Sequence, residues 1–93
     1  EAMAAGLPIA SSNRAPMQEI LGDTCVYFDP ENPADIAEAL ERLIPEPALR
    51  AELAEKSHAK AQQYSWVTCA NQTFNFLHEV YEQCNEEKKL CAA

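Results

Sequence analysis

Residues 1–13, EAMAAGLPIASSN, place the end of a helix directly before an extended segment. The residues from Glu1 to Ala5 all favour helix. Gly6 can adopt the left-handed conformation that ends a helix, and Pro8 prevents its continuation. Because so short a segment does not nucleate a helix by itself, we expect most of this helix to lie upstream of Glu1. The apolar and small residues of the stretch 8–11 then predict a strand.

A second strand is predicted at residues 25–28, CVYF, which are rich in β-branched and aromatic side chains. Residues 12–24 between the two strands are too long for a hairpin turn and match the roughly 10–12 residues that a crossover connection needs. Pro16 and Gly22 bound a short helix within this connection. We therefore expect parallel strands with a right-handed connection, and further strands outside the 93 residues, since parallel pairs rarely occur alone.

The rest of the chain is predicted to be helical. Asn32 caps a helix that Pro33 begins and Pro45 ends, Pro47 begins the next helix, and Ser65 caps the last one. The expected apolar face of the first of these helices consists of Ile36, Leu40, Leu43 and Ile44. The expected apolar stripe of the last helix consists of Trp66, Cys69, Ala70, Thr73, Leu77, Val80 and Cys84, with Trp66 as a core anchor. Residues 85–93 are expected to form a frayed tail.

The composition excludes several classes of partner. The formal net charge of −8, from 15 acidic and 7 basic residues, argues against binding to nucleic acid or to an anionic membrane surface through this segment. The four cysteines contain no C-x-x-C pair and lie apart from the two histidines, so we expect no zinc site, no other metal and no cofactor. Reduced thiols in a cytoplasmic protein fit this pattern best.

Four segments, taken in order, carry a resemblance to a known family: EAMAAGLPIASSN, QEILGD, YFDPENPADIAEALERLI and LRAELAEKSHAKAQQYSW. Together they resemble the C-terminal part of the family 4 type of retaining glycosyltransferases, the glycosyl transferases group 1. The resemblance covers residue 1 to about residue 82. It implies an α/β fold, with residues 1–84 forming part of the Rossmann-like, donor-binding C-terminal domain of a GT-B enzyme and ending in C-terminal helices.

The resemblance also implies an activity: transfer of a sugar from a nucleotide-sugar donor, a GDP- or UDP-sugar, with retention of configuration. An N-terminal domain of the same protein would then be a partner of this chain and would carry any contact with a membrane. We expect the 93-residue chain to be inactive when isolated.

One residue is predicted to bind the donor. The family has an E-x7-E motif whose second glutamate begins an E-A-M-A-x-G-x-P segment, and Glu1 matches that position. The resemblance implies that Glu1 contacts the ribose hydroxyls of the nucleotide sugar. A carboxylate suits this role because it only accepts hydrogen bonds, and the hydroxyls donate them.

The loop after the first strand is a weaker candidate. Residues 11–14, SSNR, could line the donor cleft, since ligands of open α/β sheets bind beyond the carboxyl ends of the strands. The family often has a Gly-Gly-x-Pro-Glu run here, and this chain has Arg14 to Glu19, RAPMQE, without the glycines. Glu19 matches the final glutamate, for which we expect a structural hydrogen bond. We assign no catalytic residue.

Two alternative functions stay open at this stage. One is a non-catalytic, acidic helical interaction module, and the other is a GT-B sugar-nucleotide epimerase. The sequence also leaves the donor undecided between GDP-mannose and UDP-glucose.

Overall fold

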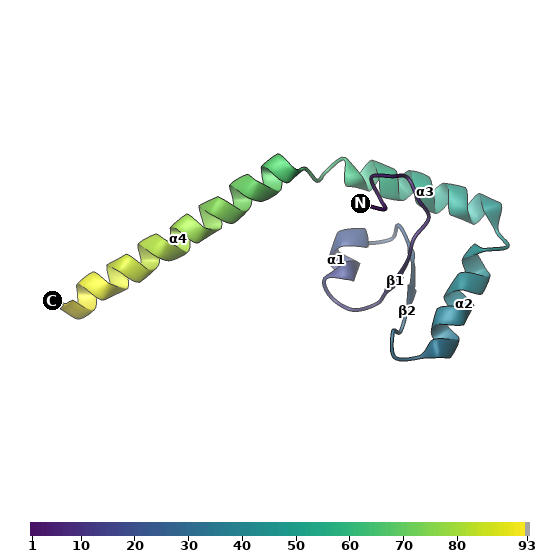
Figure 1. Cartoon of the computed structure of the whole chain (residues 1–93), viewed down its shortest axis with the longest axis horizontal. Helices are drawn as coiled ribbons and strands as arrows, with labels where there is room; N and C mark the ends of the chain where they lie inside the picture. Colours follow the sequence, from purple (N-terminus) through teal and green to yellow (C-terminus); the bar gives the residue numbers. More distant parts are fainter. Residues whose placement is uncertain (93) are drawn as a thin grey trace. The chain divides into compact units, whose positions relative to one another are not determined.

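The computed structural model describes residues 1–92, which contain two parallel strands and four helices joined by loops (Figure 1). Their order is β1 (Ala10–Ser12), α1 (Met17–Leu21), β2 (Val26–Phe28), α2 (Pro33–Leu43), α3 (Pro47–Ala61) and α4 (Trp66–Ala92). The chain divides into two units, Glu1–Gln63 and Tyr64–Ala93, and each is described by itself.

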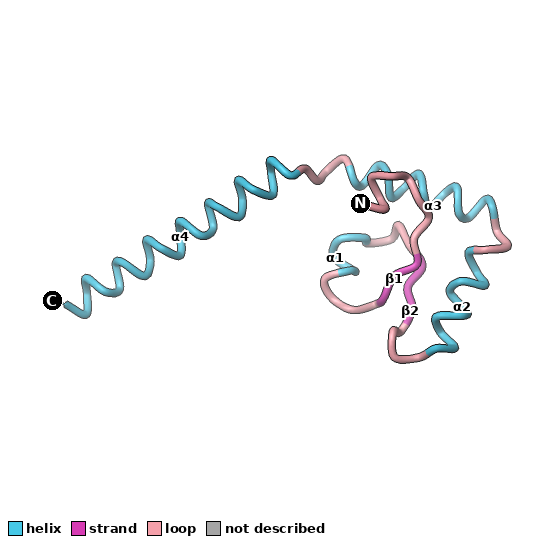
Figure 2. Tube along the Cα trace, viewed as in Figure 1, coloured by secondary structure: helices cyan, strands magenta, loops and turns pink. Residues whose placement is uncertain are grey.

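The sheet confirms the predicted parallel pairing (Figure 2). The strands pair in the register Ala10↔Val26, Ser11↔Tyr27 and Ser12↔Phe28. Backbone bonds extend the ladder at both ends, from the Val26 N–H to the Ile9 carbonyl (3.1 Å) and from the Asn13 N–H to the Phe28 carbonyl (2.9 Å). Strand β1 begins at Ala10 rather than at the predicted residue 8, and Pro8, which has no N–H to donate, lies outside the ladder.

The segment before β1 has the hydrogen bonds of a helix end. The Leu7 N–H donates to the Ala2 carbonyl (3.2 Å) and the Gly6 N–H to the Met3 carbonyl (3.0 Å). With Gly6 at φ 67°, these two bonds form a Schellman motif, as the sequence predicted for a helix C-terminus. Within the described residues, this segment forms a turn and not a helix.

The core of the first unit consists of two clusters of buried residues, and one of them lies between the sheet and helices α2 and α3. Buried Val26, Ala39, Leu43 and Leu53 form one cluster, and Met3, Leu21 and Cys25 form another. The predicted cap of α2 is confirmed, since the Asn32 side chain accepts a hydrogen bond from the Ala34 N–H at 3.1 Å. Arg50 of α3 donates to the Leu43 carbonyl (3.0 Å) and to the Ile44 carbonyl, and so satisfies two of the last carbonyls of α2.

The predicted apolar face of α2 is only partly correct. Leu43 is buried and Ile36 is half-buried, but Leu40 and Ile44 are 43% and 67% exposed. The buried stripe instead follows residues 36, 39 and 43, at the three- and four-residue spacing of one helix face. Leu40 and Ile44 lie farther around the helix than the sheet reaches.

Helix α3 approaches the chain before β1 closely because its contacting residue is small. Ser57 is fully buried, and its hydroxyl lies within hydrogen-bond distance of the Ala54 carbonyl (3.0 Å) and the Leu7 carbonyl (3.3 Å). Ser57 thus lies on the side of α3 that packs against the chain before β1.

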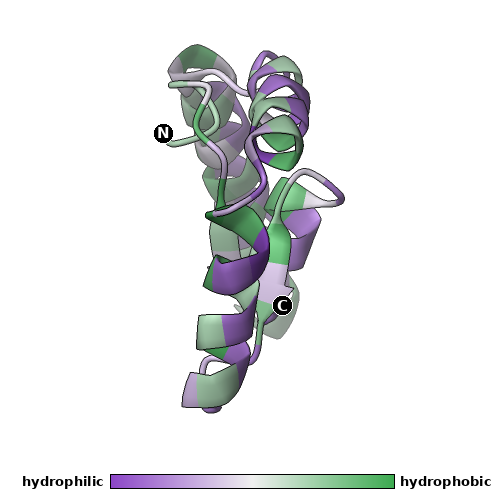
Figure 3. Ribbon diagram, turned by 90° about the vertical axis from the view of Figure 1, so that its right-hand side faces the viewer, coloured by the Kyte–Doolittle hydropathy of each residue, from purple (hydrophilic) through white to green (hydrophobic). Residues whose placement is uncertain are grey.

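Helix α4 forms the second unit. Its predicted Ser65 cap is confirmed by a hydrogen bond from the Thr68 N–H to the Ser65 Oγ at 3.1 Å. None of its described residues is buried, and Trp66, expected as a core anchor, is 83% exposed. Figure 3 shows hydrophobic and hydrophilic residues interspersed along the helices. No helix among residues 1–92 has the length and apolar character needed to cross a membrane.

The helix also includes residues 85–92, where we expected a frayed tail. The residues of this segment, NEEKKLCA, are mostly good helix formers, which accounts for its helical backbone. Residue 93 of the expected tail lies outside the described residues.

Gly22 makes the turn between α1 and β2. Its φ of 58° and ψ of −124° fall outside the left-handed helical region, where ψ is about +30 to +60°. The Leu21 carbonyl accepts hydrogen bonds from the Thr24 N–H (3.2 Å) and the Thr24 Oγ1 (2.8 Å), which closes the turn. A Cβ on Gly22 would also lie 2.5 Å from the Lys60 Nζ, an atom that can move away.

We expect Gly22→Asn to lower the free energy of unfolding by about 1–3 kcal/mol, because the strained backbone suits only glycine. The matched variant Gly6→Asn places the same side chain at a helix C′ position, which accepts asparagine. The decrease in its free energy of unfolding should therefore be smaller. Urea unfolding followed by circular dichroism measures both. Equal losses in the two variants would contradict this account of Gly22.

Tyr27 gives the fold a dependence on alkaline pH. Its hydroxyl donates to the Gly22 carbonyl at 2.6 Å. Burial raises the pKa of Tyr27 to about 12, and the hydrogen bond with Cys25 and the charge of Asp23 act in the same direction. Since the folded state favours the protonated form, this contribution to stability is complete below about pH 10 and is lost as the pH rises through about 12.

The Tyr27→Phe variant isolates the signal of Tyr27, which is the difference in tyrosinate absorbance between the wild type and the variant. In the folded protein we expect this difference to develop near pH 12. In the urea-unfolded protein the same difference signal should develop near pH 10. The measurement is a spectrophotometric titration of the wild type minus the variant. A difference signal at the same pH in both states would rule out the proposed burial effect.

Candidate functional site

Glu1 and Ser11 line the same hollow in the first unit. The hollow has a volume of about 250 Å³ and lies among the turn before β1, strand β1 and helix α1. Its lining residues are Glu1, Ala2, Met3, Ile9, Ala10, Ser11, Met17, Ile20 and Leu21. The structure therefore brings together Glu1 and the first residue of the candidate loop 11–14.

The chemistry of this hollow suits a neutral, hydroxyl-bearing group. The carboxylate of Glu1 can accept hydrogen bonds from hydroxyls, and the Ser11 hydroxyl can both donate and accept. Within residues 1–92, the Ser11 Oγ makes only a long contact of 3.4 Å with the Ser12 carbonyl. Most other lining side chains are apolar and none is basic, so the hollow offers no counter-charge to a phosphate.

Arg14 lies where the two strands end. Its Nη2 donates to the Glu31 Oε2 at 2.8 Å and to the Asp29 Oδ1 at 3.4 Å. The same Asp29 oxygen accepts a hydrogen bond from the Glu31 N–H at 3.0 Å. The loop after β1 is thereby joined to the loop after β2, and the guanidinium of Arg14 is engaged by two carboxylates.

Glu19 does not have the role that we expected. It is exposed on α1, and within residues 1–92 its side chain makes no hydrogen bond. The expectation of a structural hydrogen bond was therefore wrong for this structure. In this segment, Met17 and Ile20 line the hollow instead.

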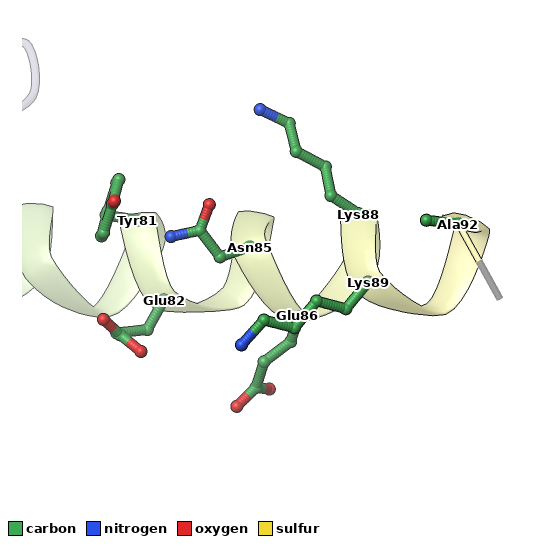
Figure 4. Close-up of a pocket in the computed structure, with 7 residues that line it drawn as sticks. All are labelled: Tyr81, Glu82, Asn85, Glu86, Lys88, Lys89 and Ala92. Atoms are coloured by element: carbon green, nitrogen blue, oxygen red, sulfur yellow. The ribbon is translucent and has the colours of Figure 1, made fainter.

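A larger hollow of about 460 Å³ runs along α4 (Figure 4). Its lining residues, Tyr81, Glu82, Asn85, Glu86, Lys88, Lys89 and Ala92, all come from that one helix. The side chains of Lys88 and Glu86 extend to opposite sides of the helix in Figure 4. With no second element to wall it and no convergent polar groups, this surface does not form a binding site in the described part of the chain.

Sequence reasoning missed two parts of the site. The contribution of Met17 and Ile20 could have been found from their three-residue spacing on one face of the short helix. The carboxylate partners of Arg14 could not be identified from spacing alone, although Asp29 and Glu31 directly follow the second strand. Among residues 1–92, no group of three or more His, Cys, Asp or Glu side chains is placed to hold a metal.

The chain is similar to known proteins over most of its length. The family model of the glycosyl transferases group 1 matches residues 1–60. O-antigen chain mannosyltransferase B of Escherichia coli is 31% identical over 75 residues, which are 81% of this chain and 20% of that protein. Sucrose-phosphate synthase from Thermosynechococcus elongatus superposes with a TM-score of 0.71 at 22% identity, over 88% of this chain and 21% of the synthase.

These comparisons confirm the resemblance that the sequence motifs indicated, and they define its extent. The chain spans about a fifth of the length of each of these two relatives. The matched residues include Glu1, both strands and the loops that follow them. The chain belongs to the glycosyl transferases group 1 family, and its α/β fold is that of part of a GT-B glycosyltransferase.

Proposed function

We propose that the full-length protein transfers a sugar from a nucleotide-sugar donor to an acceptor with retention of configuration, and that this chain supplies part of the donor site. The observation that carries the proposal is the position of Glu1. It lies within the segment matched by the family model and shares a hollow with Ser11 of β1. Ligands of open α/β sheets bind beyond the carboxyl ends of the strands.

Glu1 is the proposed ribose ligand. A carboxylate can accept hydrogen bonds from two neighbouring hydroxyls at once, as acidic residues do on the ribose of dinucleotides. The absence of a basic side chain among the residues lining the hollow agrees with a contact to hydroxyls rather than to phosphate.

The rest of the reaction is assigned to other parts of the protein. Departure of a nucleoside diphosphate needs positive charge near the phosphates, and this chain has a net charge of −8. We propose that basic groups earlier in the donor domain stabilise the leaving diphosphate and that an N-terminal domain binds the acceptor. A cytoplasmic location, with any membrane contact made outside this segment, belongs to the same proposal.

Glu1→Gln in the full-length protein tests the ribose contact. The amide retains the size of the side chain but loses its negative charge, and a hydrogen bond to a charged group contributes about 1.5–3 kcal/mol. We therefore expect the Kd for the nucleotide sugar to rise about 10- to 100-fold, as measured by isothermal titration calorimetry.

Glu38→Gln is the matched control, because Glu38 is exposed on α2 and lies outside the hollow. Its Kd should equal that of the wild type. A Glu1→Gln variant with wild-type affinity and unchanged unfolding would refute the assignment of Glu1 to the donor.

The 93-residue chain should bind neither GDP-mannose nor UDP-glucose at millimolar concentration, whereas the full-length protein should bind one of them. The reason is that the hollow offers hydroxyl contacts but no cation for the diphosphate. The mannosyltransferase relative makes GDP-mannose the first donor to test. Titrations followed by NMR line broadening would detect weak binding, and tight binding by the isolated chain would disprove the proposed location of the phosphate contacts.

Product analysis separates the transferase from the two alternatives. A transferase releases nucleoside diphosphate and elongates an acceptor, whereas an epimerase converts the nucleotide sugar without an acceptor. An interaction module would do neither.

A further inference from the structure

We propose that Arg14 is a positioning residue for the donor site: through Glu31 and Asp29 it clamps the loop after β1 to the loop after β2 and so sets the place of Ser11. This inference rests on the proposed function of the hollow that Ser11 shares with Glu1. It does not require Arg14 to contact the donor.

The clamp joins three elements of the first unit. The Arg14 Nη2 contacts the Glu31 Oε2 (2.8 Å) and the Asp29 Oδ1 (3.4 Å). The Asp29 N–H in turn donates to the Asp35 Oδ2, in the first turn of α2. The end of β1, the end of β2 and the start of α2 are thus connected through side chains at one edge of the sheet.

The local charge argues against a phosphate ligand at Arg14. In the loops after the two strands, residues 13–16 and 29–32, Arg14 is the only basic residue. It is joined to Asp29 and Glu31, and Asp35 adds a third carboxylate to the network. Because acidic groups outnumber the guanidinium at this edge, a diphosphate would meet net negative charge there.

The clamp can act on Ser11 because few contacts join the chain that follows it to the loop after β2. Strand β1 has three residues. Beyond it, the Asn13 N–H makes one further ladder bond, to the Phe28 carbonyl at 2.9 Å, and Arg14 follows directly. Releasing Arg14 therefore loosens the loop next to the residue that lines the hollow.

The expected effect is modest. The side chains of Arg14, Asp29 and Glu31 are 57%, 43% and 82% exposed, and exposed ion pairs are weak because water screens them. We expect Arg14→Gln and Glu31→Gln each to raise the donor KM of the full-length protein about two- to fivefold with kcat unchanged. Since both residues act in one contact, the double variant should be no worse than either single variant.

Two rescue variants distinguish the clamp from a merely structural role. Both ion pairs use the same nitrogen of Arg14, so a lysine, with its single charged nitrogen, should retain the wild-type KM in Arg14→Lys. The exchanged pair Arg14→Glu/Glu31→Arg should recover at least half of the affinity lost in Arg14→Glu. Steady-state kinetics with varied donor measures all variants.

A different pattern would overturn the proposal. If Arg14→Gln raised the donor KM more than tenfold while Glu31→Gln left it unchanged, Arg14 would contact the donor directly. If neither variant changed the donor KM, Arg14 would have no positioning role.

Hydrogen exchange keeps this test separate from the proposed function. Faster exchange at residues 11–16 in both Gln variants would show the clamp even if no nucleotide sugar bound. Failure of the wild type to bind any nucleotide sugar would refute the proposed function, and unchanged exchange in both variants would refute the clamp.

Discussion

Parallel pairing of two very short strands is the constraint on which the arrangement of this chain depends. Because β1 and β2 run in the same direction, both strands end at the same edge of the sheet. The loops that leave them are therefore neighbours, and Arg14 can reach Asp29 and Glu31. An antiparallel pair would have put these residues at opposite ends. The same pairing requires a crossover between the strands, and α1 within it forms one wall of the hollow that contains Glu1.

So small a sheet is held in place largely by the helices. Val26 of β2 packs with Ala39 and Leu43 of α2 and with Leu53 of α3. Ser57 of α3 donates a hydrogen bond to the Leu7 carbonyl in the chain before β1, and so joins two segments that are far apart in the sequence. Helices distant in sequence thus fix the strand that carries Ser11, so changes in α3 would be transmitted to the hollow through packing.

Signals that act within a few residues were predicted correctly. Asn32 and Ser65 cap helices, Gly6 ends a turn of helix, and Gly22 ends the short helix α1, because each depends on local backbone geometry. Burial was predicted less well, as Leu40, Ile44 and Trp66 show, because it depends on which surface a helix meets. The candidate site divides in a similar way: the family motif is the basis for proposing Glu1 as a donor ligand, whereas the partners of Arg14 depend on strand register, which the sequence does not state.

The separation that we propose between hydroxyl-binding and phosphate-binding groups has a physical reason. A carboxylate that holds the ribose repels the diphosphate attached to it, so cations next to the phosphates must outweigh that charge locally. If Arg14 were free, it would be the natural cation at this edge of the sheet. Its engagement by Asp29 and Glu31 instead leaves this edge acidic. The nucleotide sugar would then be oriented across the site, with its ribose toward this chain and its diphosphate toward basic groups elsewhere in the protein. An acidic segment can in this way contribute to binding an anionic donor.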